Sequence, residues 1–94
     1  MIKIAILTPC IADGDAVSND VIGMHQSLMK NGYEVEVFAA GWSSDKHKIQ
    51  PVKEIRKFLQ RKSDILIYHY SVGWDDALHL LQEINCKKVV KYHN

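Results

Sequence analysis

The sequence predicts an α/β fold of the Rossmann-like, three-layer type with a four-stranded parallel sheet. Short apolar segments alternate with amphipathic ones along the 94 residues, in the order βαβαβαβ. The apolar segments are mostly continuous, which is typical of parallel strands covered on both faces. Right-handed crossovers would join them. Because the second strand is the most polar, we expect it at an edge, which gives the strand order 2-1-3-4.

The first strand and helix are the clearest elements. Ile2–Leu7 is an apolar run interrupted only by a lysine, which favours a buried strand. A helix is expected from about residue 18 to residue 31, with Ser18 or Asn19 at its N-cap, because both side chains accept hydrogen bonds from helix N–H groups. Gly32 should end this helix in the left-handed conformation.

The middle of the chain is more polar. In Glu34–Ala39, glutamates alternate with apolar residues, which predicts a second strand with one wetter face. Residues 41–50 are polar and predict a loop. Pro51 should begin a second helix, because proline is tolerated in the first helical turn.

The last third of the chain repeats the strand–helix–strand pattern. Asp64–Tyr68 predicts a third, buried strand and Ser71–Trp74 a turn. Asp75–Ile84 predicts a third helix, because two aspartates occupy the first turn, where the helix dipole favours negative charge. Lys88–Tyr92 predicts the fourth strand. The loop after the first strand and the turn after the third should then face each other at the switch point of the sheet.

Composition indicates one ordinary globular domain, residues 1–94. Apolar residues make up 47% of the chain, and the formal net charge is +1, which gives no general reason to expect a nucleic-acid partner. Cys10 and Cys86 have no disulfide-framework spacing, so reduced thiols in a cytoplasmic protein are expected. We expect no signal peptide and no membrane span.

The loop after the first strand carries the most chemical information. It holds one glycine, Gly14, and three carboxylates, Asp13, Asp15 and Asp20. Phosphate-binding loops use several glycines and exposed N–H groups. Carboxylates repel phosphate but accept hydrogen bonds from hydroxyl groups, so this loop favours a sugar or polyol over a nucleotide tail.

Three stretches together resemble the N-terminal domain of retaining glycosyltransferases with the GT-B fold, the group 1 type of family 4. They are the first strand with the Asp-Gly-Asp-Ala-Val-Ser-Asn-Asp loop and a helix ending in Leu-Met-Lys-Asn-Gly-Tyr-Glu-Val, then Asp-Ile-Leu-Ile-Tyr-His-Tyr-Ser-Val-Gly at 64–73, and Lys-Lys-Val-Val-Lys-Tyr-His-Asn at 87–94. The resemblance covers the whole chain.

Such enzymes transfer a sugar from a nucleotide-sugar donor to an acceptor hydroxyl. The resemblance implies that this chain is the acceptor-side portion, without the C-terminal domain that holds the donor and carries a Glu-x7-Glu motif. Alone, the chain should be inactive. No cofactor is expected.

The resemblance also implies a role for His93, which would contact the donor sugar near the scissile bond. The other candidates are substrate-binding residues: Asp13, Gly14, Asp15, Ser18, Asn19, Asp20, His69 and Trp74. Each has a structural alternative. The loop residues are also an ordinary helix-capping set, the histidines can be surface or turn residues, and a tryptophan before a helix can simply pack.

Two further expectations concern metals and membranes. No spacing among the five histidines and two cysteines matches a metal site, so none is expected. A cationic run could bring the protein to the inner face of a membrane, but the sequence favours a solvated helix face. Its members are Lys46, Lys48, Lys53, Arg56, Lys57, Arg61 and Lys62.

Two other functions stay open. The pattern Cys10-x3-Gly14-x3-Ser18 resembles the phosphocysteine loop of small sugar-phosphotransferase domains, but a phosphate-accepting thiolate needs a positive pocket, and the loop is acidic. The second alternative is a non-catalytic α/β binding module. If the chain is the glycosyltransferase fragment, its exposed fourth strand at 88–92 should promote self-association.

Overall fold

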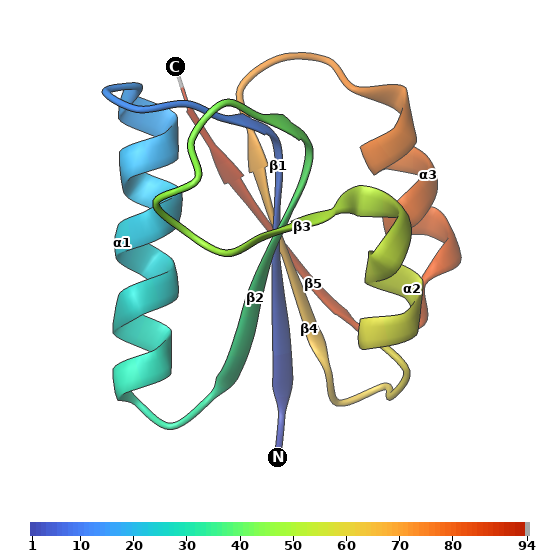
Figure 1. Cartoon of the computed structure of the whole chain (residues 1–94). Helices are drawn as coiled ribbons and strands as arrows, with labels where there is room; N and C mark the ends of the chain where they lie inside the picture. Colours follow the sequence, from blue (N-terminus) through green and yellow to red (C-terminus); the bar gives the residue numbers. More distant parts are fainter. Residues whose placement is uncertain (94) are drawn as a thin grey trace.

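The computed structural model describes residues 1–93. Asn94, which ends the third stretch of the family resemblance, lies outside the described residues. A parallel sheet crosses the molecule, with helices packed on both faces (Figure 1). The elements in chain order are β1 (Lys3–Ile11), α1 (Ala16–Lys30), β2 (Glu34–Trp42), β3 (Ile49–Pro51), the 3-10 helix η1 (Val52–Glu54), α2 (Ile55–Phe58), β4 (Ile65–Tyr70), α3 (Asp75–Glu83) and β5 (Lys87–Tyr92).

The sheet has two apolar faces because side chains alternate along each strand. One face packs against α1, and the other packs against α2 and α3 (Figure 1). The α1 side is formed by Ile4, Ile6, Ile11, Val21, Val35, Val37, Ala39 and Ile49. The opposite side is formed by Ala5, Leu7, Phe38, Ile55, Leu59, Leu66, Tyr68, Ala77, Leu80 and Ile84. The α/β class and the parallel sheet are therefore as the sequence predicted.

The expected four-stranded sheet in the order 2-1-3-4 is wrong in its strand count and in its full order. The order is β3-β2-β1-β4-β5. The short strand β3 pairs with β2 through Val37 and Ile49, so β2 is not an edge strand. Pairings β2–β1, β1–β4 and β4–β5 are parallel. The polar side chains of β2 reflect partial exposure of one face and not a position at the edge of the sheet.

β1 is longer than expected and α1 begins earlier. The strand continues past Leu7 to Ile11, and its register with β2 runs from Lys3 to Ile11. Helix α1 begins at Ala16, and its N-cap is Asp15, not Ser18 or Asn19. Several consecutive residues here can cap a helix, so the sequence alone does not select one.

The segment between β2 and β4 differs most from expectation. Residues 41–50 are not all loop, because β2 extends to Trp42 and β3 begins at Ile49. Pro51 ends β3 and caps η1, and the helix expected there is only η1 followed by the four-residue α2. The apolar face predicted for that helix is still used, since Ile55 and Leu59 are buried beneath the sheet.

The turn after α1 is as predicted. Gly32 has φ +89°, the left-handed region that a side chain disfavours. Its N–H donates to the carbonyl of Met29, and the N–H of Tyr33 donates to the carbonyl of Leu28. These bonds satisfy carbonyls at the helix end and direct the chain into β2.

β5 is the most exposed strand of the sheet. All six of its residues are exposed, and among residues 1–93 it pairs with β4 alone. Val89 and Val90 lie on opposite faces, and each is about half exposed. The carboxyl end of this strand nevertheless contributes to the partly buried polar cluster described below.

Candidate functional site

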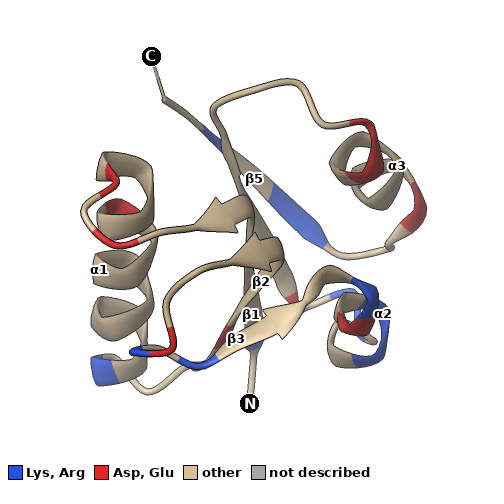
Figure 2. Ribbon diagram, turned by 45° about the horizontal axis from the view of Figure 1, so that its top comes forward, with Lys and Arg blue, Asp and Glu red and all other residues tan. Residues whose placement is uncertain are grey.

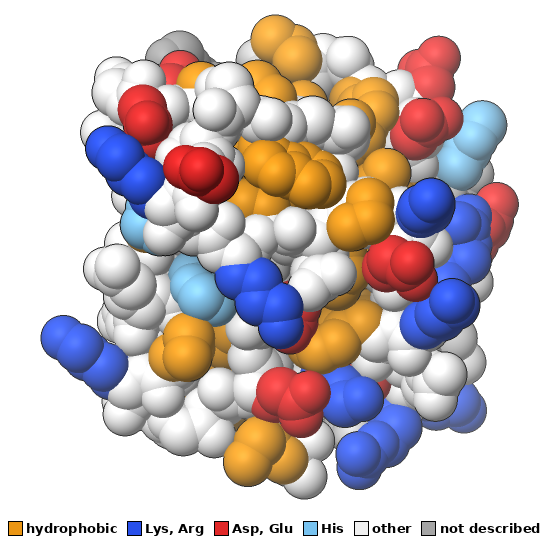
Figure 3. Space-filling view, in the orientation of Figure 1, with side chains coloured by type: hydrophobic (Ala, Val, Ile, Leu, Met, Phe, Trp, Pro, Cys, Tyr) orange, Lys and Arg blue, Asp and Glu red, His pale blue; other side chains and the backbone are white. Residues whose placement is uncertain are grey.

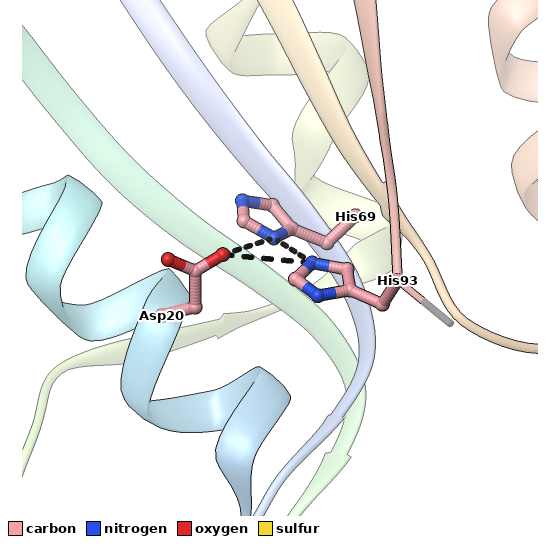
Figure 4. A group of neighbouring side chains, drawn as sticks. All are labelled: Asp20, His69 and His93. Atoms are coloured by element: carbon pink, nitrogen blue, oxygen red, sulfur yellow. Dashed lines mark hydrogen bonds and ion pairs between the residues drawn. The ribbon is translucent and has the colours of Figure 1, made fainter.

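The candidate site lies where β4 and β5 end, on the face of the sheet covered by α1. His69 is the penultimate residue of β4, and His93 directly follows β5. Asp20 approaches them from the first half of α1 (Figure 4). Ligand sites of open parallel sheets lie at the carboxyl ends of strands. Three of the residues expected from the sequence therefore meet in the expected region.

The three side chains are close enough to act as one group. Nδ1 of His69 is 2.8 Å from Nε2 of His93. Oδ2 of Asp20 lies 3.8 Å from Nδ1 of His69 and 3.6 Å from Nε2 of His93. The two imidazole rings are stacked, with centroids 5.0 Å apart and an interplanar angle of 21°. We call Asp20, His69 and His93 the Asp–His–His cluster.

His69 is fully buried, and burial determines its protonation. Its Nε2 lies 3.4 Å from Sδ of Met24 on α1. A thioether sulfur can only accept, so this contact places the His69 proton on Nε2 and leaves Nδ1 to accept a hydrogen bond from His93. Burial, followed by the charge of His93, lowers the pKa of His69 to about 4. The buried imidazole is therefore neutral at physiological pH.

Asp20 is held as a carboxylate. Nζ of Lys91 lies 2.6 Å from its Oδ2. The hydrogen bond from Lys91 outweighs partial burial and holds the pKa of Asp20 below its ordinary value. Asp20 is 38% exposed and His93 is 17% exposed at the side chain, so the cluster opens to solvent on one side. It combines an ionised acceptor with imidazole nitrogens that can donate or accept.

The backbone holds His93 in place. Its N–H donates to the carbonyl of Tyr70 at 2.9 Å, continuing the ladder of β5 by one residue. In the register between these strands, Lys91 pairs with His69. Side chains two residues apart share one face, which is why Lys91 and His93 both point towards α1.

The other loop candidates have structural roles in the chain. Oδ2 of Asp15 accepts hydrogen bonds from the N–H and the hydroxyl of Ser18, both at 2.9 Å. The Ser18 hydroxyl in turn accepts from the N–H of Ala12 at 3.0 Å. Gly14 has φ +78° and makes the turn into the helix. This network caps α1 and positions Asp20 one turn later.

Asp13 and Asn19 lie away from the Asp–His–His cluster. Both are exposed. Asp13 forms a surface ion pair with Lys46 at 3.6 Å. The side chain of Asn19 has no described protein partner, and its N–H donates to the carbonyl of Asp15 within the first helical turn. The structure therefore selects Asp20 from the acidic loop as the residue that meets the histidines.

Trp74 lies on the opposite face of the sheet. It packs against the core beneath α2 and α3 and lies 6.3 Å from the Tyr68 ring, centroid to centroid. It also occupies the N-cap position of α3. The structure does not bring Trp74 to the cluster, and its packing role, one of the two interpretations of the sequence, accounts for its position.

A shallow hollow joins the ends of β1 and β4, as the sequence predicted for the loops at the switch point. Its lining residues are Thr8, Pro9, Cys10, Asp15, Val17, Ser71 and Val72. None of these carries a positive charge, while Asp15 adds a negative one. A phosphate would meet no cation here, which gives no support to the phosphocysteine alternative through Cys10.

Two residues of the site were not recognised in the sequence. They are Lys91 on β5 and Met24 on α1, and neither was among the candidates expected from the sequence. The signal was present, since Asp20 and Met24 are four residues apart on one helix face and Lys91 and His93 are two apart on one strand face. These residues come together only because α1 packs over the ends of β4 and β5, which the sequence alone does not show.

Carboxylates neutralise much of the cationic run. Arg56 pairs with Glu83 at 2.6 Å, and Lys57 pairs with Glu54 at 3.4 Å. Basic and acidic residues are interspersed along the α2 ribbon (Figure 2), and their side chains are interspersed over the face seen in Figure 3. Among residues 1–93, no helix is long and apolar enough to cross a membrane.

Comparison of the chain with known proteins gives no significant match. No family model matches it, and neither the curated proteins nor the solved structures include a significant match. Its function is therefore argued from the geometry of the site and from the motifs of the sequence.

Proposed function

We propose that this chain is the acceptor-side, N-terminal part of a retaining glycosyltransferase with the GT-B fold. The parent protein would transfer a sugar from a nucleotide-sugar donor to an acceptor hydroxyl. The observation that carries this proposal is the convergence of Asp20, His69 and His93 at the carboxyl ends of parallel strands. The motif resemblance supports the same proposal from the sequence, since its three stretches contain these three residues.

The chemistry of the cluster suits sugar hydroxyls. The Asp20 carboxylate accepts hydrogen bonds only, whereas His93 keeps one ring nitrogen, Nδ1, that is not bonded to His69 and can take part in a hydrogen bond with a hydroxyl group. Hydroxyl groups donate and accept, so a sugar could satisfy both types of partner. Lys91 keeps Asp20 ionised, and the negative charge disfavours a phosphate next to it. In the proposal, His93 contacts the donor sugar and Asp20 binds a hydroxyl.

The buried His69 acts as a positioning residue in this scheme. Its Nδ1 lies 2.8 Å from His93 and its Nε2 contacts Met24. Nδ1 of His69 accepts a hydrogen bond from the Nε2–H of His93. The other ring nitrogen of His93, its Nδ1, therefore keeps a free lone pair. That nitrogen can accept a hydrogen bond from a sugar hydroxyl. A neutral His69 favours this arrangement because it adds no positive charge beside His93.

Donor binding would be the task of a second domain, so we propose that the chain alone does not catalyse transfer. The expected partners are the nucleotide-sugar donor, the hydroxyl acceptor and the C-terminal domain. We propose a cytoplasmic location for the parent protein. Contact with the inner face of a membrane stays a prediction, to which the paired cations of α2 add no support.

The test compares the proposed parent protein, expressed from the whole gene, with the 94-residue chain. With a panel of UDP-, GDP- and ADP-sugars, the parent protein should show sugar transfer, whereas the transfer activity of the 94-residue chain should not exceed that of a heat-inactivated control. In the parent protein, His93→Ala should lower kcat/KM by at least about 10-fold, which corresponds to the loss of one hydrogen bond to a polar partner. The matched control is His79→Ala, since His79 is an exposed residue of α3. Turnover by the chain alone, or equal kcat/KM for both variants, would refute the proposal.

A further inference from the structure

We propose that the Asp–His–His cluster is a binding site for a divalent transition metal ion, with Zn²⁺ as the best fit. The ligand atoms would be Oδ2 of Asp20, Nδ1 of His69 and Nε2 of His93, which all lie within 4.8 Å of one another. The inference does not rest on the proposed glycosyltransferase function, because it concerns only these three side chains.

The distances match a tetrahedral ion. Zinc bonds to histidine nitrogen and carboxylate oxygen are about 2.0–2.1 Å long, so two ligand atoms on a tetrahedron lie about 3.3 Å apart. The three separations in the cluster are 2.8, 3.6 and 3.8 Å, and they bracket that value. An ion requires only that the two imidazole nitrogens separate by about 0.5 Å and that the carboxylate approach by a similar distance.

The chemistry of the three ligands favours Zn²⁺ over a hard cation. Two imidazole nitrogens and one carboxylate oxygen are the ligand set of catalytic zinc sites, whereas Mg²⁺ and Ca²⁺ prefer oxygen ligands alone. The Nε2 of His69 contacts the Met24 sulfur, so its proton lies on Nε2 and Nδ1 offers its lone pair to the ion. His93 would bind through Nε2 as its Nδ1–H tautomer, so the proton that Nε2 shares with His69 in the metal-free chain moves to Nδ1. A second contact of this kind commonly fixes the tautomer of a metal-binding histidine.

The cluster leaves a fourth position open. His69 is buried, but Asp20 and His93 are partly exposed, so an ion would reach the site from solvent and keep a water molecule as its fourth ligand. This arrangement distinguishes the site from a closed structural zinc site. No fourth protein ligand is required by the proposal.

Lys91 is the main opposing group. Its Nζ lies 2.6 Å from the same Oδ2 that would bind the ion, and its charge repels a cation. A carboxylate has a second oxygen, and the Lys91 side chain is 43% exposed, so it can move to that oxygen or to solvent. Replacement of Lys91 should therefore strengthen metal binding, a result that a simple surface histidine pair would not give.

The test measures Zn²⁺ binding to the purified chain by isothermal titration calorimetry near neutral pH, in parallel with the visible absorption of bound Co²⁺. We expect one ion per chain and a tetrahedral Co²⁺ spectrum. His93→Gln and Asp20→Asn should each weaken binding by at least about 10-fold, and Lys91→Gln should tighten it by about 2- to 10-fold. The exposed His79→Gln should bind like the unchanged chain.

Far-UV circular dichroism confirms folding of each variant, and the partly exposed His93 and Asp20 are chosen so that the buried His69 need not be altered. Absence of Zn²⁺ binding, or equal affinity of the unchanged chain and His93→Gln, would overturn the proposal. Since no sugar is present in these measurements, failure of metal binding leaves the proposed transfer function to be judged by its own assay.

Discussion

Mild acid should destabilise the chain through His69. In the folded state this imidazole is fully buried and its pKa is about 4, whereas an unfolded histidine has a pKa of about 6.5. Between these pH values the unfolded chain binds one more proton than the folded chain. Stability is therefore complete above pH 6.5 and decreases as the pH falls towards 4.

The size of the effect follows from the same two values. One pH unit corresponds to about 1.4 kcal/mol per proton, so the interval from 6.5 to about 4 amounts to a loss of about 3 kcal/mol in the free energy of unfolding. Small domains have a total of about 5–15 kcal/mol. The pKa values of Asp20 and Asp64 are lowered from 3.8. Their contributions to the free energy of unfolding are therefore lost mainly at lower pH, and they do not obscure the effect of His69.

The assay is urea denaturation followed by far-UV circular dichroism, at several pH values from about 7 to about 4.5. The unchanged chain should lose stability at close to 1.4 kcal/mol per pH unit in the centre of the window. His69→Gln keeps a polar side chain but cannot titrate, so its stability should change much less with pH. His79→Gln should retain the slope. An equal slope for the unchanged chain and His69→Gln would refute the burial argument.

Four further predictions concern other parts of the fold. Asp64 accepts backbone hydrogen bonds from Lys3, Gln60 and Arg61, so Asp64→Ala should lower the free energy of unfolding by about 3 kcal/mol, whereas the exposed Asp45→Ala should change it little; equal urea midpoints would contradict this. The buried hydroxyl of Tyr68 has no hydrogen-bond partner among residues 1–93, so Tyr68→Phe should be neutral or stabilising in the same assay, and a clear loss would indicate a partner. Burial raises the pKa of Cys86, so iodoacetamide should label it more slowly than an unfolded thiol at equal pH, as mass spectrometry can show. The chain should self-associate through β5 in sedimentation experiments at micromolar concentration, and a monodisperse monomer would count against an available strand edge.

The sequence allowed the class of the fold to be predicted because the central strands are strongly patterned. Continuous apolar runs at 2–7 and 64–68 indicate parallel strands that are covered on both faces, and β1 and β4 lie at the centre of the sheet. A glycine after an amphipathic segment also has few alternatives. Because these features depend only on neighbouring residues, they can be predicted without knowledge of the tertiary structure.

The remaining differences have tertiary causes. β3 consists of only Ile49–Pro51, too short for a periodic pattern, and its pairing depends on the position of β2. The extension of β1 beyond Leu7 depends on the same neighbour. The helix after Pro51 stops at Phe58, although the apolar spacing would allow a longer one, and the chain then turns around the buried carboxylate of Asp64.

The site was predictable in part for a related reason. His69 was a candidate because it ends a strand beside the switch point of the sheet, whereas His93 was a candidate because the family resemblance implies a role for it. The choice of Asp20 among several acidic residues depends on the start of α1, which Asp15 sets by capping the helix. Trp74 was a candidate because a tryptophan can stack on a sugar, but its side chain packs into the core on the other face of the sheet.

The exposed strand β5 has a consequence for the geometry of the cluster. It carries Lys91, and the next residue after the strand is His93, whose backbone is hydrogen-bonded to Tyr70. A strand that pairs with the outer edge of β5 would restrain the twist of the same backbone. Small rotations at this edge change the separation of the two imidazoles, so the spacing of the cluster responds to whatever segment the edge binds.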